Sequence, residues 1–190
     1  MATDNIYDAL RESHERQRSL CRKLVRAKPG TQDRISLFKQ LHVELEAHAA
    51  AEERFLYAPA LMDDAGLKSS RHALHEHHEI EELVEDLHKA DAEGGQWLAV
   101  ARKLSEKVHH HLREEEKKFF QVTGKILSDT AKQQAARKYR RDYARMLEKL
   151  SARAGSDVGG LGRQVGRQRR RARAGHRLHR RHAEGERGHR

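Results

Sequence analysis

Apolar residues recur at alternating steps of three and four positions along five segments of the chain, which is the period of an α-helix with one buried face. Breaking and capping residues separate these segments, and the expected helices run over about residues 4–27, 32–59, 69–93, 96–124 and 129–150. The connections are short, so successive helices should be antiparallel neighbours. The pattern predicts an all-α fold, an up-down-up-down four-helix bundle with an additional C-terminal helix.

Polar residues interrupt the apolar stripe of each of the first four helices, at positions where a core side chain is expected. Two of these helices carry a histidine followed four residues later by a glutamate, and the other two carry a single histidine. The six candidate metal ligands are His14, His48, Glu52, His77, His111 and Glu115. Polar groups in this register indicate a buried site rather than a solvated face.

A constant offset of 63 residues relates the two halves of this pattern. It takes His14 to His77, His48 to His111 and Glu52 to Glu115. The single histidine also precedes the His-x-x-x-Glu histidine by 34 residues in both halves. The chain therefore contains an internal duplication of a helical hairpin.

Residues four apart on a helix project from the same face, so each His-x-x-x-Glu pair can reach one centre. Six such groups cannot be buried together without a compensating cation, because an unpaired polar or charged group costs several kcal/mol in a dry core. Two divalent ions bridged by the two carboxylates would satisfy them, each with about two imidazoles and open positions. Iron, manganese and zinc all accept these ligand types.

The remaining polar residues near this pattern fall off the stripe. Seven histidines are expected in solvent for this reason: His42, His72, His75, His78, His88, His109 and His110. Glu53 and Glu116 also repeat, as acceptors for a ligand histidine or as surface carboxylates, and the second interpretation is the expectation. A ferritin-like site is rejected, because Glu85-x-x-His88 and Glu106-x-x-His109 lie off the stripe and lack inward partner glutamates.

The net charge of +10 is unevenly distributed. Residues 151–190 hold 12 arginines and 3 acidic residues, so residues 1–150 carry only +1, with 27 basic and 26 acidic residues. We therefore expect the bundle over residues 1–125, the extra helix over 126–150, and an Arg/Gly-rich disordered tail over 151–190. The nearly neutral bundle gives no indication of nucleic-acid binding.

Targeting and redox signals are sparse. No apolar run reaches the ~18 residues of a membrane span, and the N-terminus lacks a signal-peptide core, which predicts a cytoplasmic protein without membrane contact. The single cysteine, Cys21, excludes an intramolecular disulfide and a CxxC metal site.

Four stretches resemble the hemerythrin-like proteins with the HHE cation-binding domain: SHERQRSL, HAAAEERFLYAP, LHEHHEIEELVEDL and HLREEEKKFF. The resemblance spans roughly residues 1–125. It implies a four-helix bundle with a non-haem di-iron centre that interacts with oxygen, peroxide or nitric oxide, as a sensor, scavenger or oxidative-stress protein.

The chain departs from the oxygen-carrying members of that family. They have a further histidine one helical turn from the ligand of the third helix, where this chain has Ala73 and Glu81, and an aspartate one residue beyond the position of Glu115. With four imidazoles, the pattern is more similar to bacterial HHE proteins that handle iron or nitrosative and oxidative stress.

Two other functions stay open at this point. One is iron storage or delivery without turnover. The other is binding of nucleic acid or an anionic surface through the basic tail, which would be salt-sensitive and unspecific because the tail lacks aromatic residues to stack on bases. Enzymatic turnover and the oligomeric state are not predicted by any motif.

Overall fold

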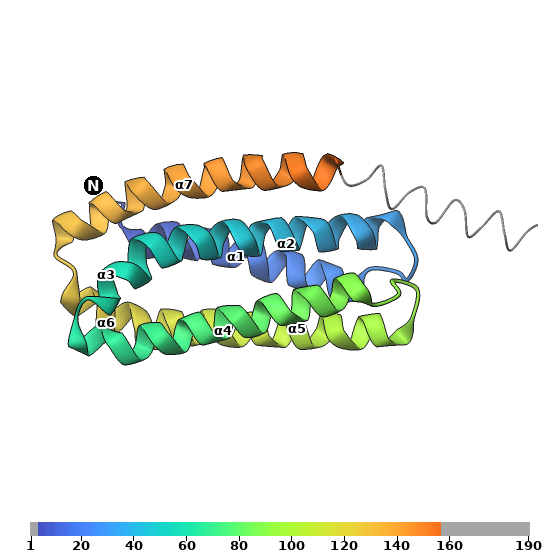
Figure 1. Cartoon of the computed structure of the whole chain (residues 1–190), viewed down its shortest axis with the longest axis horizontal. Coiled ribbons are helices and arrows are strands. Elements are labelled where there is room, and N and C mark those ends of the chain that lie inside the picture. Colours follow the sequence, from blue (N-terminus) through green and yellow to red (C-terminus); the bar gives the residue numbers. More distant parts are fainter. Residues whose placement is uncertain (1–3, 157–190) are drawn as a thin grey trace, which may run out of the picture. The chain divides into compact units, whose positions relative to one another are not determined.

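The computed structural model describes residues 4–156, and every regular element in that part of the chain is helical (Figure 1). Residues 1–151 form one compact unit, and the second unit, residues 152–190, contributes only the last turn of α7 to the described range. The elements are α1 (Ile6–Arg26), α2 (Gln32–Glu52), η1 (Glu53–Tyr57), α3 (Ala58–Leu61), α4 (Asp64–Lys89), α5 (Gly95–Glu114), η2 (Glu115–Phe119), α6 (Phe120–Ile126) and α7 (Asp129–Ser156). The elements η1 and η2 are π-helical turns. The predicted all-α bundle with an extra C-terminal helix is confirmed.

Capping side chains set where the helices begin. The Asn5 side chain accepts from the backbone amides of Tyr7 and Asp8, so α1 starts just after the predicted cap at residue 3 or 4. Helix α4 begins at Asp64 behind an Asp63 cap, earlier than the predicted start near residue 69. Its first turn lies against α3, and a Cβ at Gly66 would stand 2.2 Å from the Ala60 carbonyl oxygen.

Two π-turns interrupt helices that the apolar pattern predicts as regular. The backbone continues helically through Pro59, but η1 follows directly after α2, and η2 follows directly after α5. A π-turn contains one residue more than an α-turn, so it rotates the side chains beyond it relative to those before it. Through this rotation Tyr57 is fully buried.

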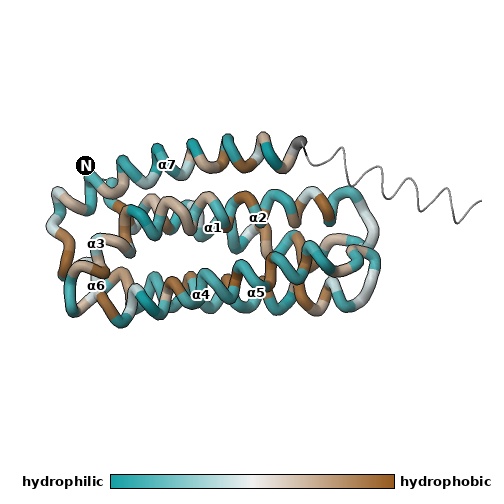
Figure 2. The backbone as a smooth tube through the Cα atoms, in the orientation of Figure 1, coloured by the Kyte–Doolittle hydropathy of each residue, from teal (hydrophilic) through white to brown (hydrophobic). Residues whose placement is uncertain are grey.

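The bundle core consists of two hydrophobic clusters, with the predicted polar residues between them along the helices. Hydrophobic and hydrophilic residues alternate along each helix (Figure 2). Helix α1 packs against α2 and α5, and α4 packs against α5. One cluster gathers around Leu10, Leu56 and Phe119, and the other around Leu41, Val84 and Leu104. The two clusters lie on either side of the polar layer along the helices.

Helix α7 lies along α1 and α2 (Figure 1). It buries Ala136, Tyr139, Tyr143 and Leu150, and Ala135, Met146 and Leu147 are half-buried beside them. Arg140 donates to Asp4 and Glu12 on the α1 side, and Arg54 of η1 pairs with Asp142. This fifth helix gives α1 a second buried face, on which Ile6, Ala9 and Ser13 are covered.

No helix in residues 4–156 combines the length and apolar character that a membrane span requires. The Arg/Gly-rich tail predicted for residues 151–190 lies outside the described residues from position 157 onwards.

Candidate metal centre

All six predicted ligands point into the layer between the two hydrophobic clusters. Five of them are at most 2% exposed, and the His77 side chain is 10% exposed. Their positions on four helices follow from the helical phase of the stripes: α1 supplies His14, α2 supplies His48 and Glu52, α4 supplies His77, and α5 with η2 supplies His111 and Glu115.

The inward-facing atoms form two overlapping groups, in each of which all ligand atoms lie within 4.8 Å of one another. The first group is His14, His48, Glu52 and Glu115, and the second is Glu52, His77 and His111. Glu52 Oε2 lies 3.1 Å from His48 Nε2 and 3.5 Å from His77 Nε2, so this carboxylate belongs to both groups.

The second carboxylate also faces both groups. Glu115 Oε2 lies 3.5 Å from His14 Nε2 and 3.8 Å from His111 Nε2. Ligand atoms about 2.0–2.2 Å from a metal ion lie roughly 3–4 Å from each other. The spacing of these atoms is therefore compatible with metal binding.

Several inward-facing polar atoms are fully buried without a hydrogen-bond partner in residues 4–156. They are His14 Nε2, His48 Nε2, Glu52 Oε1, Glu52 Oε2 and Glu115 Oε2. Buried polar groups are paired in nearly all proteins, and leaving one unpaired costs about 1–3 kcal/mol or more. The concentration of such atoms at one centre indicates a cation as the missing partner.

Outward-facing atoms of the four imidazoles have partners instead. His14 Nδ1 lies 2.8 Å from Glu116 Oε1, and His77 Nδ1 lies 2.8 Å from Glu53 Oε1. The expectation that Glu53 and Glu116 are plain surface carboxylates is wrong, because each accepts from a histidine of the other hairpin. Such contacts fix the ring orientation and leave Nε2 free to bind a metal.

The other two imidazoles show where the repeat loses its symmetry. His111 Nδ1 faces Glu76 Oε2 at 3.1 Å. The residue that matches Glu76 in the first half of the repeat, 63 positions earlier, is Ser13. The Ser13 Oγ lies 2.5 Å from His48 Nδ1, and the Tyr139 hydroxyl of α7 lies 2.9 Å from the same nitrogen. His48 alone among the four imidazoles thus has neutral hydroxyl partners in place of a carboxylate.

A tyrosine that the apolar pattern does not single out also enters the centre. The Tyr57 hydroxyl donates to Glu115 Oε1 at 2.7 Å and lies 3.4 Å from His77 Nε2. The repeat-equivalent residue is Phe120, which has no hydroxyl. The phase shift of η1 brings Tyr57 inward, so a regular helix pattern could not have found it.

Burial and close packing shift the pKa values of these groups in opposite directions. Burial raises the pKa of Glu115 well above its ordinary value, reinforced by the neighbouring Glu52 carboxylate. Burial acts in the same sense on Glu52, but His48 and His77 hold its pKa well below the usual range. Burial lowers the pKa of His14 to about 4, whereas Glu52 and Glu53 overcome burial at His77 and raise its pKa to about 9. Binding of a cation would displace the remaining protons.

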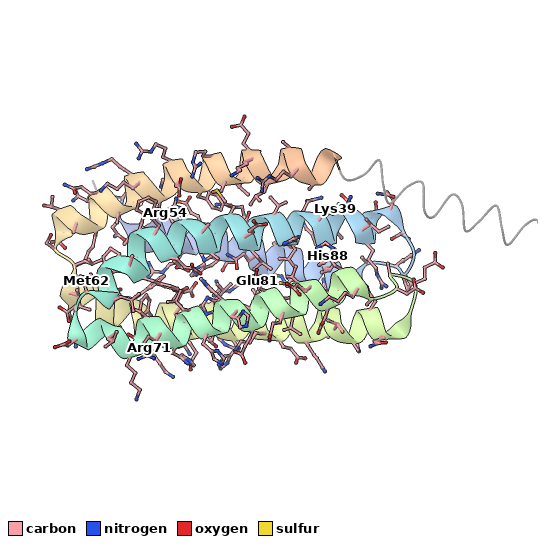
Figure 3. All side chains as sticks on the ribbon, viewed as in Figure 1. Lys39, Arg54, Met62, Arg71, Glu81 and His88 are labelled. Carbon is pink, nitrogen blue, oxygen red and sulfur yellow. The ribbon has the colours of Figure 1, made fainter. Side chains whose placement is uncertain are left out.

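A cavity of about 530 Å³ opens between α2 and α4 and reaches the centre. His48, His77 and His111 line its inner end, and the wall is largely apolar, with Leu45, Ile80 and Val84. Charged residues from both helices form its outer part, among them Glu81, which Figure 3 labels on α4. A small molecule can therefore approach the candidate ligands from this side.

The histidines predicted to lie off the stripe stay outside the centre. His72, His75, His78, His88 and His110 are exposed, and His42 and His109 are half-buried. His88, labelled in Figure 3, contacts His42, with 3.1 Å between His88 Nε2 and His42 Nδ1. Neither residue is one of the six predicted ligands. The helical phase thus separates the two classes of histidine.

Comparisons with known proteins show the family and the fold of the chain. Residues 5–123 match the Hemerythrin HHE cation binding domain family. The crystal structure of a hemerythrin HHE cation binding domain-containing protein from Mycobacterium kansasii superposes with a TM-score of 0.69 at 22% identity, covering 84% of this chain and 94% of that one. A protein described as a DNA nickase from Nostoc sp. is 26% identical over 150 residues, which is 79% of this chain. Those residues cover 42% of the nickase, so the chain matches less than half of that relative's length.

Proposed function

The chain belongs to the hemerythrin HHE cation-binding domain family, and from that premise we propose that it is a non-haem di-iron protein that binds or reacts with a small oxidant. Oxygen, peroxide and nitric oxide are the candidate ligands, and the role is that of a sensor, scavenger or stress-response protein. The observation that carries the proposal is the set of unpartnered, buried imidazole and carboxylate atoms around one centre.

The six predicted ligands can be assigned to two iron ions. His14 and His48 would hold one iron and His77 and His111 the other, with Glu52 and Glu115 between them. When bound, the two irons would supply redox chemistry and open positions for a small ligand. Iron is the proposed metal, although manganese or zinc would suit the same ligand types.

The surrounding residues orient the ligands and control access to them. Four outward hydrogen bonds fix the imidazole rings, and Tyr57 holds the Glu115 carboxylate from inside the core. The two hydrophobic clusters exclude water from the centre on either side along the helices. A small molecule would therefore approach through the cavity between α2 and α4.

Metal analysis combined with optical spectroscopy tests this function. Iron-loaded protein, reduced without oxygen, should contain about two iron ions per chain and change its spectrum when oxygen, peroxide or nitric oxide is added. Repeated consumption of peroxide would identify an enzyme, and a reversible change with oxygen would identify a binding protein. Bound iron without any spectral response would favour storage or delivery instead.

A second candidate function involves DNA, because the Nostoc relative is described as a DNA nickase. Helix α7 offers a surface for phosphates, since Arg137, Lys138 and Arg141 are exposed on one face and form no ion pair in the described part of the chain. Lysine and arginine that neutralise phosphates give affinity that falls steeply with salt.

The DNA function is tested with supercoiled plasmid and with a labelled duplex. We expect salt-dependent binding that weakens by about tenfold or more when Arg137, Lys138 and Arg141 are all replaced by glutamine. Equal binding by the triple variant would remove this surface from consideration. Absence of nicking by the metal-loaded full chain would restrict the resemblance to the fold.

A further inference from the structure

Gln17 is a buried polar residue to which neither hairpin motif assigns a role. It lies on α1 one turn beyond His14 and is 1% exposed. Its Nε2 is fully buried and has no hydrogen-bond partner among the described residues, and its side chain lines the cavity together with His48, His77 and His111. The amide is therefore an unused donor beside three candidate metal ligands.

The repeat shows that a polar residue is not required at this position. In the layer one turn from the histidines, the four matched positions are Gln17 and Ile80, and Leu45 and Val108. The other three are apolar and buried, so packing alone would be served by an aliphatic side chain. An unpaired buried amide destabilises the fold, so packing does not explain its presence.

The cavity supplies that explanation. Leu45, Ile80 and Val84 give its lining an apolar part, and Gln17 is the one amide side chain among the lining residues in the described part of the chain. Rotation about the last side-chain bond is broad for glutamine, so the amide can turn its N–H groups into the cavity at little cost. It keeps those donors at every pH, unlike the neighbouring imidazoles.

We infer that the Gln17 amide donates a hydrogen bond to a small ligand that enters the α2–α4 cavity and binds at the metal centre. The inference rests on the proposed function. It predicts a ligand with lone pairs on oxygen or nitrogen, and preference for a small anion over a neutral molecule of similar size, because hydrogen bonds to charged acceptors are the stronger ones. Gln17 thus sets ligand selectivity without holding the metal.

Azide is the probe for this inference, because it is a small anion whose terminal nitrogens accept hydrogen bonds. Iron-loaded wild-type protein and Gln17→Leu are titrated with azide, and iron content and melting temperature are measured in parallel. We expect unchanged iron content, azide affinity lowered by about tenfold or more, and melting at an equal or higher temperature because an unpaired buried amide is gone. Ser70→Ala, which removes another buried and unpaired polar group that does not line the cavity, should bind azide like wild type.

The outcomes are separable. Wild-type protein that binds iron and azide, with Gln17→Leu binding azide equally well, would overturn the inference and leave the proposed function intact. That result would show that the Gln17 amide donates to water in the cavity and not to the ligand. Equal losses in Gln17→Leu and Ser70→Ala would also overturn it, since a general effect of losing a buried polar group would then explain the result. Wild-type protein without iron or without any azide response would defeat the proposed function itself.

Discussion

At the scale of single residues, the centre depends on which side of a helix each histidine occupies. Neighbouring residues on an α-helix differ by about 100°, so the run His109-His110-His111 can send only one imidazole into the core. His111 is 2% exposed and faces Glu115 and His77, whereas the His110 side chain is 53% exposed. We therefore expect only His111 of these three histidines to bind the metal.

Replacing His111 by alanine should lower bound metal by at least half and abolish the response to small oxidants, because it removes a ligand from one of the two groups. Glu115→Ala should do nearly as much by removing a bridge. His110→Ala and His109→Ala serve as matched controls and should keep wild-type metal content. Metal analysis of the four variants decides the register, and loss of metal in His110→Ala alone would contradict it.

Cys21 illustrates a buried group without chemistry. Its side chain is fully buried in the cluster around Leu41 and Leu104, and burial raises the pKa of the thiol to about 12. The thiolate is the reactive species, so at pH 8 the native protein should not react with a thiol reagent over hours. Full labelling should follow in denaturant. Rapid stoichiometric labelling of the native protein would show that this cluster opens readily.

At the scale of the elements, two features explain where inference from sequence ends. Helical period and the 63-residue repeat suffice to predict the four helices and the convergence of the candidate ligands, because an inward stripe has a fixed phase in a bundle. Tyr57 escapes this reasoning, since the π-turn that rotates it inward leaves no trace in the apolar spacing. The contact between Tyr139 and His48 could not be predicted either. An apolar stripe on α7 indicates a buried face, but it does not indicate which helices that face packs against.

Helix α7 acts on the centre through one hydroxyl group. Tyr139→Phe should keep the helix packed, because its ring still stacks on Tyr143, but it removes one of two partners from His48. We expect metal affinity to fall by about tenfold, as for other partners of ligand histidines. Competition with a chelator measures the change, and Tyr7→Phe, which loses a hydroxyl contact to Thr123 instead, is the control. Equal affinities in the two variants would exclude a role for α7 at the centre.

At the scale of the whole molecule, metal and fold should be coupled. The polar layer separates two hydrophobic clusters, so unpaired ligands weaken the middle of the bundle while both ends stay packed. Any ion that binds only the folded state stabilises it by mass action, about 2.7 kcal/mol at a hundredfold excess over Kd.

Removing the metal should therefore lower the melting temperature by roughly 5–10 °C while the far-ultraviolet circular dichroism stays helical at 25 °C. Thermal scans of chelator-treated and reloaded protein provide the measurement. The double variant His14→Ala/His77→Ala, which lacks two of the predicted ligands, should melt at the same temperature after either treatment. Identical melting of wild-type protein with and without metal would contradict a buried six-ligand site.

The unequal surroundings of His48 and His111 have a consequence for metal composition. Three imidazoles donate to carboxylates, which makes them stronger electron donors, while His48 donates to the hydroxyls of Ser13 and Tyr139. The position built on His14 and His48 should then bind its ion less tightly than the position built on His77 and His111. Filling would proceed in two steps, and a mixture of two different metals could sort into a heterobimetallic pair, one element at each position.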